Sequence, residues 1–155
     1  RAMPWINPDK PFLEQIKSFL QETERMGRSG LMHHWVMIRP WDETLLGLIG
    51  FDNITRTSEA KWNLGYWVRS SEQRHGFAKK SINATLGWLG AVEEVIVELK
   101  VDPMNLAGVN TVSQTVSNWN GERNISGDSA VTVAGVRTLH HCHLVVTNPK
   151  STEIM

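Results

Sequence analysis

The chain has 155 residues, with sixteen basic and sixteen acidic side chains that leave a formal net charge of zero. This length fits one domain that can bury a core without disulfides or structural metals. The balanced charge argues against broad binding of nucleic acid or of an anionic membrane, which needs a basic excess. Cys142 is the single cysteine, so no intrachain disulfide can form, and a cytoplasmic location is the simpler expectation. No apolar run approaches the roughly 20 residues that cross a bilayer, and no signal peptide is expected from the first residues of the sequence.

The first predicted element is a helix over Phe12–Met26. Asp9 is the expected N-cap, and Gly27 favours the end of the helix. Apolar residues recur there at helical spacing and would share one face: Phe12, Leu13, Ile16, Phe19, Leu20 and Met26.

Three strands are predicted next, over His34–Ile38, Leu45–Phe51 and Trp62–Val68. Their succession favours antiparallel pairing. Helical spacing returns after Gly76 and continues to Gly90. A β-branched, alternating segment over Glu94–Val101 predicts a further strand.

The remaining elements are a short polar helix within Leu106–Trp119 and a final pair of strands over Val131–Val136 and Leu139–Val146. The strand–helix–strand unit from Trp62 to Val101 is long enough for a parallel crossover. The predicted fold class is therefore α+β, a mixed and mostly antiparallel sheet flanked by helices, in a single domain over residues 1–155.

The loop between the strand that ends at Val68 and the helix after Gly76 has the features of an anion site. The first turn of a helix offers free N–H groups, and the macrodipole adds about half a positive charge. Gly76 permits close approach to the backbone, and cationic or donor side chains surround it: Arg74, His75, Lys79 and Lys80. The segment matches neither the dinucleotide fingerprint nor the P-loop pattern, so both of those classes are excluded.

This loop resembles the pyrophosphate loop of the GNAT acetyltransferase superfamily, which has the pattern [RQ]-x-x-G-x-[GA]. Gln73, Gly76 and Ala78 fit that pattern. The preceding segment, Glu59–Val68, contains a Gly-Tyr-Trp strand that is similar to the branch acetylating the N-termini of ribosomal proteins. Met3-Pro4-Trp5-Ile6 and Leu48-Ile49-Gly50-Phe51 also resemble that branch, so the resemblance extends from about Met3 to Gly121.

The resemblance implies acetyl-CoA as the cosubstrate, with no metal. The backbone from Gln73 to Lys79 would hold the CoA pyrophosphate, and the strand edge at Trp67, Val68 and Arg69 would pair with the pantetheine arm. A backbone N–H near Val68 would polarise the thioester carbonyl. The implied cofactor-binding set in this region is Trp67, Val68, Arg69, Gln73, Arg74, His75, Gly76, Phe77, Ala78 and Lys79.

The implied reaction is transfer of an acetyl group to a primary amine, with a protein N-terminal α-amine as the expected acceptor. An α-amine titrates near pH 7.7–8.0 and a lysine near 10.4, so the α-amine needs less help to become neutral. Two alternatives remain open: a small-molecule amine as acceptor, and a noncatalytic acyl-CoA-binding module.

Family members also carry an Asn-x-x-Ser pair that opens the helix after the next strand, and two registers are compatible here. Asn105 lies at the right distance from the strand, but Gly108 replaces the serine. Asn110 and Ser113 supply both residues, and this second register is slightly preferred. Asn105 and Asn110 are both expected cofactor contacts. The family's first strand and first helix would precede Met3, and the chain is expected to lack them.

Glu98 is the expected general base and Ser113 the expected hydrogen-bond donor to the thiolate. Glu98 lies on the strand beside the implied cofactor cleft, and a partly buried carboxyl would suit proton abstraction. The alternative is a structural role for Glu98 in which it pairs with Lys100 or a neighbouring strand. Asp52 and Glu59 are further candidates for the base. Tyr66 is the single tyrosine, so a tyrosine acid from the later helix is impossible.

The run His140-His141-Cys142-His143 contains metal-ligating residue types. In a strand, His141 and His143 share one face while His140 and Cys142 share the other, so one ion cannot easily use all four. No metal site is therefore expected. Core positions are expected for Trp35, Trp62, Trp67 and Trp88, whereas Trp5 and Trp41 could wall an acceptor pocket.

Overall fold

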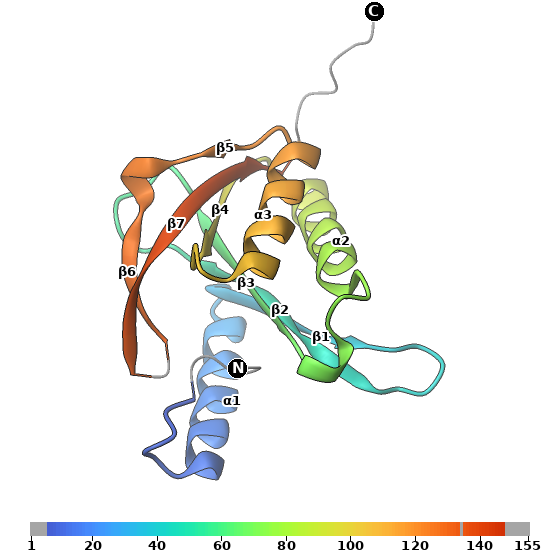
Figure 1. Cartoon of the computed structure of the whole chain (residues 1–155). Helices are drawn as coiled ribbons and strands as arrows, with labels where there is room; N and C mark the ends of the chain where they lie inside the picture. The colour runs from blue at the N-terminus through green and yellow to red at the C-terminus, as the bar shows by residue number, and fades with distance from the viewer. Residues whose placement is uncertain (1–5, 134, 148–155) are drawn as a thin grey trace, which may run out of the picture.

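The computed structural model describes residues 6–133 and 135–147 (Figure 1). Helix α1 (Phe12–Arg28) precedes a meander of β1 (Met32–Ile38), β2 (Leu45–Asn53) and β3 (Trp62–Val68). Helix α2 (Phe77–Val92), strand β4 (Ile96–Val101) and helix α3 (Leu106–Asn118) follow. The chain then forms β5 (Glu122–Arg123), β6 (Ser129–Val133) and β7 (Val136–Val146). None of the helices in this part of the chain is long and apolar enough to span a membrane.

The strands form one twisted sheet in the order β1-β2-β3-β4-β7-β5, and β6 pairs with β7 as a hairpin. The first three strands are antiparallel, β4 is parallel to β3, and β7 is antiparallel to β4. The α+β class and the parallel crossover through α2 are thus confirmed. Strand β1 is an edge of the sheet in the described residues.

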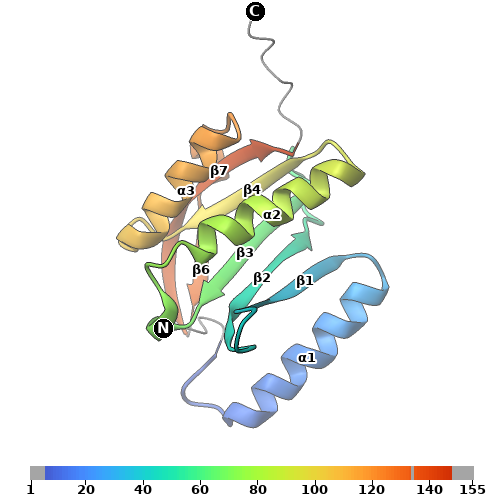
Figure 2. The same ribbon diagram turned by 90° about the vertical axis from the view of Figure 1, so that its right-hand side faces the viewer.

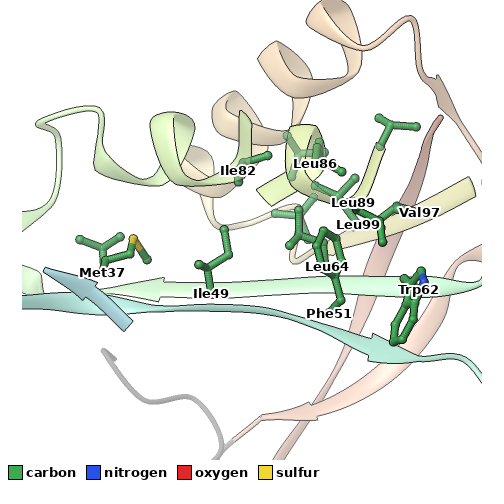
Figure 3. Packing of buried hydrophobic residues seen from close by; sticks show 14 of the residues in the cluster. Met37, Ile49, Phe51, Trp62, Leu64, Ile82, Leu86, Leu89, Val97 and Leu99 are labelled. Atoms are coloured by element: carbon green, nitrogen blue, oxygen red, sulfur yellow. The ribbon is translucent and has the colours of Figure 1, made fainter. Parts of the chain in front are cut away.

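Helices α2 and α3 cover one face of the sheet, and the main core lies between them and the strands (Figures 2 and 3). Ile82, Leu86 and Leu89 are fully buried residues of α2 that pack on Phe51 and Val97 of the sheet. Each such side chain contributes about 1.5–3 kcal/mol by leaving water. Because side chains alternate along a strand, the odd-numbered residues of β4 enter this core and the even-numbered ones point to the opposite face.

Helix α1 lies beside β1 on the face opposite α2 and α3, and it has no buried residue (Figure 2). Its Phe19 ring lies 6.3 Å from the ring of His34 on β1. The predicted apolar face exists, but much of it is exposed, including Phe12, Leu13 and Leu20. The expected cap was wrong: Pro11 occupies the N-cap position without a side-chain bond, and the helix continues through Gly27 to Arg28.

The last hairpin differs from the prediction at its turn. Gly135 has a φ of 80°, a left-handed conformation that favours glycine, and it separates β6 from β7. Val136 therefore begins β7, whereas the sequence pattern assigned it to the preceding strand. The two-residue β5 was not predicted, because so short a segment has no periodicity.

Candidate active site

The loop before α2 has the backbone of an anion site. Gly76 is the N-cap with a φ of 77°, and Arg74 is also left-handed with a φ of 65°. No side chain caps the helix, and the first helical bond runs from the Lys80 N–H to the Gly76 carbonyl at 3.1 Å. The N–H groups of Phe77, Ala78 and Lys79 therefore precede the helical ladder and have no acceptor within it.

Side-chain contacts fix this loop to the sheet. The Gln73 amide donates to the Val68 carbonyl at 3.0 Å, and Arg39 from the β1–β2 connection binds Glu72 at 3.0 Å. His75 lies 3.2 Å from the Glu72 carbonyl oxygen. By contrast, Arg74, Lys79 and Lys80 are exposed, and no carboxylate of the described residues pairs with them. Their charges are available to an anion.

A notch opens between β3 and β4 next to this loop. The two strands pair at only two positions, Trp62 with Val97 and Asn63 with Glu98. From Leu64 onward β3 has no partner on that side, although β4 continues to Val101. The strands are thus paired at the apex, beside Glu98, and separate towards the loop that precedes α2 (Figure 1). We call this V-shaped gap the notch.

The open edge of β3 offers backbone donors to the notch. The Arg69 N–H donates to the Leu46 carbonyl of β2 at 2.8 Å, so it points away from β4. Since backbone groups alternate along a strand, the N–H groups of Tyr66 and Val68 point towards the notch. Trp67 lies between them, and its indole Nε1 is buried with no hydrogen-bond partner in the described part of the chain.

Tyr66 connects β3 to α3 through a hydrogen bond with Thr111. The Thr111 hydroxyl also donates to the Ala107 carbonyl at 3.0 Å. Burial raises the pKa of Tyr66, and the bond to Thr111 opposes that shift. Ser113 is exposed and lies two residues from Thr111, which is about 200° around the helix axis. The side of α3 that faces Tyr66 therefore carries Thr111, whereas Ser113 points elsewhere.

Asn105 is the asparagine that opens the helix. Its side chain accepts a hydrogen bond from the Gly108 N–H at 3.1 Å and caps α3. Asn110 lies in the second turn and is exposed. The structure thus has the helix start of the first register, and the roles of Asn105, Asn110 and Ser113 with a cofactor stay predictions.

Glu98 lies at the apex of the notch on the face away from α2 and α3. It is 4% exposed, and its carboxylate is bound by Arg56, whose Nη2 is 2.6 Å from Oε1 and 2.7 Å from Oε2. Lys100 Nζ lies 3.6 Å from Oε1. The Lys100 contact agrees with the pairing that the structural alternative expected, and the role of Glu98 as a base stays a prediction. Arg56 occupies one acceptor site on each oxygen, and a carboxylate has about four such sites.

Cys142 completes this cluster from β7. Its Sγ lies 3.9 Å from Glu98 Oε2, and burial together with the Glu98 charge raises the thiol pKa to about 11. The thiol is therefore neutral and inert at physiological pH. The neighbouring His143 is on the other face, where burial and Arg123 lower its pKa. No group of three metal-ligating side chains occurs within residues 6–133 and 135–147.

The other candidate residues lie farther from the notch. Asp52 binds His34 Nε2 at 2.8 Å, on the same face as Glu98 and one strand beyond Asn63. Glu59 is exposed in the β2–β3 connection, as is Trp41 in the β1–β2 connection. Trp88 is 43% exposed and so is less buried than expected, whereas Trp62 is a core residue. Trp5 and the Met3–Trp5 part of the predicted motif lie outside the described residues.

Sequence reasoning missed Arg56. It lies 42 positions from Glu98 in a polar connection between β2 and β3, where no pattern distinguishes a functional arginine from a solvated one. The alternation Glu98-Leu99-Lys100 did indicate that Glu98 and Lys100 share a face.

Comparison with known proteins agrees with this geometry. A family model described as the acetyltransferase (GNAT) domain matches residues 1–120, so the chain belongs to the GNAT acetyltransferase family. It is an acetyl-CoA-dependent N-acetyltransferase. A search of curated protein sequences gave no match.

Several solved structures share the fold. The ribosomal-protein-S5-alanine acetyltransferase of Vibrio fischeri is 16% identical with a TM-score of 0.72, over 95% of this chain and 80% of that one. RimJ of Mycobacterium smegmatis, in complex with CoA-disulfide, is 17% identical with a TM-score of 0.70, over 96% and 72%. Spermidine N-acetyltransferase of Vibrio cholerae, in complex with CoA and spermine, is 13% identical with a TM-score of 0.67, over 86% and 76%. These likenesses establish the fold, not the acceptor.

Proposed function

We propose that this enzyme acetylates the α-amine of a protein N-terminus, with acetyl-CoA held in the notch. The observation that carries the proposal is the end of β3–β4 pairing at Asn63 and Glu98, beside a helix N-terminus whose N–H groups are free. A chain-like cosubstrate with an anionic end fits such a gap. Its pyrophosphate would lie on the N–H groups from Gln73 to Lys79, near the unpaired charges of Arg74 and Lys79.

The edge of β3 would hold the arm of the cosubstrate. The N–H groups of Tyr66 and Val68 face the notch, and strand-like pairing with an extended ligand uses such groups. The Val68 carbonyl is already bound by Gln73, so the Val68 N–H is the free group at this position. A thioester carbonyl beside that N–H would be polarised, and the charge that develops on its oxygen would be stabilised.

The chemistry of the acceptor favours an α-amine. Freeing a neutral amine at pH 7 costs about 1.2 kcal/mol for an α-amine and about 4.6 kcal/mol for a lysine side chain. Glu98 is the proposed proton acceptor, and Arg56 already occupies one acceptor site on each of its oxygens, which leaves fewer sites for a proton. A site with a base so encumbered suits the less basic amine.

A small polyamine is the second candidate acceptor, because spermidine acetyltransferases share the fold. Release of CoA thiol separates the two candidates. The panel contains a lysine-free peptide with a free N-terminus, the same peptide with a blocked N-terminus, and spermidine. We expect CoA thiol to be released with the peptide that has a free N-terminus, and not with the blocked peptide or with spermidine. Release with spermidine and not with the free peptide would overturn the assignment of the acceptor while leaving the acetyltransferase activity intact.

A further inference from the structure

Glu98 is the one buried charged residue in the described part of the chain. It sits at the apex of the notch, where β3 and β4 cease to pair. Even-numbered residues of β4 point to the face away from α2 and α3, so the carboxylate lies on the side of the sheet opposite those helices. An acceptor that reaches the apex from this face meets the residues around Glu98.

Two cations surround this single carboxylate. The Arg56 side chain is 50% exposed and binds both carboxylate oxygens, while Lys100 is 15% exposed and lies 3.6 Å from Oε1. Lys100 also donates to Ser129 Oγ at 2.8 Å, which fixes its ammonium group beside the apex. Arg56, Lys100 and Glu98 together carry one net positive charge, and the exposed Arg56 guanidinium presents that charge to solvent.

Two of the nearby carboxylates, Asp128 and Asp52, are already paired and do not offset this charge. Asp128 is taken by Arg123, with both of its oxygens bound at 2.6 Å. Asp52, in the same row of the sheet as Asn63 and Glu98, is bound to His34. Glu59, on the same connection as Arg56, and Glu122, in the same row of the sheet as Glu98, are exposed and have no ion pair among the described residues. At the apex itself, however, a polycationic amine would be repelled by Arg56.

We propose that Arg56 determines acceptor specificity: it favours N-termini followed by acidic residues and disfavours polycationic amines and basic N-termini. This inference rests on the proposed function. An acidic side chain one or two residues from the reacting amine can contact the exposed guanidinium edge of Arg56. Such an exposed pair changes catalytic efficiency by up to about fivefold per charge, and salt weakens it because the Debye length is about 8 Å at physiological ionic strength.

The test compares kcat/KM for three peptides that differ only at their second and third residues, beginning Ser-Asp-Glu, Ser-Ala-Ala and Ser-Arg-Arg, with spermidine as a fourth acceptor. For the unmodified enzyme we expect the acidic peptide to be the best acceptor and the arginine peptide the worst of the three. The ratio between them should fall as salt is added. Equal efficiencies, or a ratio that does not respond to salt, would overturn the role of Arg56.

Variants then assign the preference to this residue. Arg56→Gln should remove most of the ratio between acidic and arginine peptides, and Arg56→Lys should keep much of it. Arg28→Gln, on the exposed face of α1, is the matched control and should behave as the unmodified enzyme. A ratio in Arg56→Gln equal to that of the control would overturn the inference. If Arg56→Gln does not fold, the peptide ratio of Arg56→Lys and the salt dependence of the ratio in the unmodified enzyme serve as the test. Acetylation of spermidine without acetylation of any peptide would instead refute the proposed function.

Discussion

Gly76 offers the sharpest test of the cofactor site, through the substitution Gly76→Glu. A side chain at this position would meet open space, since a Cβ placed on Gly76 would have no heavy atom within 4 Å. Its left-handed φ of 77° costs a residue with a Cβ about 1–2 kcal/mol. The new carboxylate would lie at the N-terminus of α2, where its interaction with the helix dipole stabilises the fold by about 0.3–1 kcal/mol. We therefore expect only a small loss of stability.

The loss of CoA affinity should be much larger. A carboxylate about 5 Å from a phosphate charge costs about 1–3 kcal/mol for effective dielectric constants between water and a protein surface, or about 5- to 150-fold in affinity per charge. Gly76→Ala separates strain from charge, because it adds the Cβ alone. We expect it to weaken binding less than Gly76→Glu does.

Isothermal titration calorimetry with CoA measures this effect, and Gly87→Glu is the control. Gly87 lies on the exposed side of the same helix, also has open space at its Cβ, and has no left-handed φ. It carries the same change in charge about three turns away from the loop. Equal CoA affinity for Gly76→Glu and Gly87→Glu would refute the location of the pyrophosphate site.

Four further changes test other parts of the structure. Leu86→Ala should lower the free energy of unfolding by about 2–5 kcal/mol in urea titrations, because Leu86 is fully buried, whereas Val92→Ala, at an exposed position, should cost less than about 0.5 kcal/mol. Asn105→Ala should cost about 0.5–2 kcal/mol through loss of the α3 cap, and a comparable loss in Asn110→Ala would contradict the cap. Tyr66→Phe should lower the free energy of unfolding by about 0.5–1.5 kcal/mol, because it removes the hydroxyl that bonds with Thr111. An unchanged urea midpoint would argue against that bond. Arg123 holds the pKa of Asp128 below its usual range, so the ionised carboxylate stabilises the fold above the unfolded pKa of about 3.9, and this contribution is lost as pH falls below that value. Asp128→Asn should therefore show a weaker loss of stability between neutral and acidic pH than the unmodified protein, and an identical pH profile would refute this role.

The elements with strong periodicity were predictable from the sequence. The meander of β1, β2 and β3 and the helix α2 follow from alternating and helical patterns that tertiary packing reinforces. The start of α1 could not be predicted, because Asp9 donates its N–H to the Asn7 side chain and Pro11 occupies the N-cap position. The residue that becomes the N-cap depends on which local hydrogen bonds are the more stable, and several polar residues near the start of α1 can form such bonds.

The register of α3 illustrates a second limit. The sequence offered Asn105 and Asn110 with nearly equal support, and the choice depends on where the chain turns after β4. Asp102 accepts a hydrogen bond from the Met104 N–H at 2.9 Å, which turns the chain at once and makes Asn105 the cap. The loop before α2 needed no such detail, because a strand, a glycine and a helix follow one another directly along the chain.

Contacts between segments that are distant in the sequence could not be predicted from it. The sequence indicated Glu98 as a candidate and Lys100 as its neighbour, but Arg56 comes from a connection with no regular pattern. The burial of Glu98 also depends on β7, which supplies Cys142 and Leu144 to the same face. Charge pairing of this kind is a property of the folded sheet and not of any local segment.

If the notch delivers an acetyl group to an α-amine, mass spectrometry of a peptide acceptor will find the group there. A peptide with a free N-terminus and internal lysines is incubated with acetyl-CoA, and fragmentation locates the added group. We expect one acetyl group on the α-amine with the unmodified enzyme and with Gly87→Glu, and much less modification with Gly76→Glu. Acetylation confined to the lysine side chains would refute the α-amine as acceptor, and equal modification by Gly76→Glu would refute the role of the loop before α2.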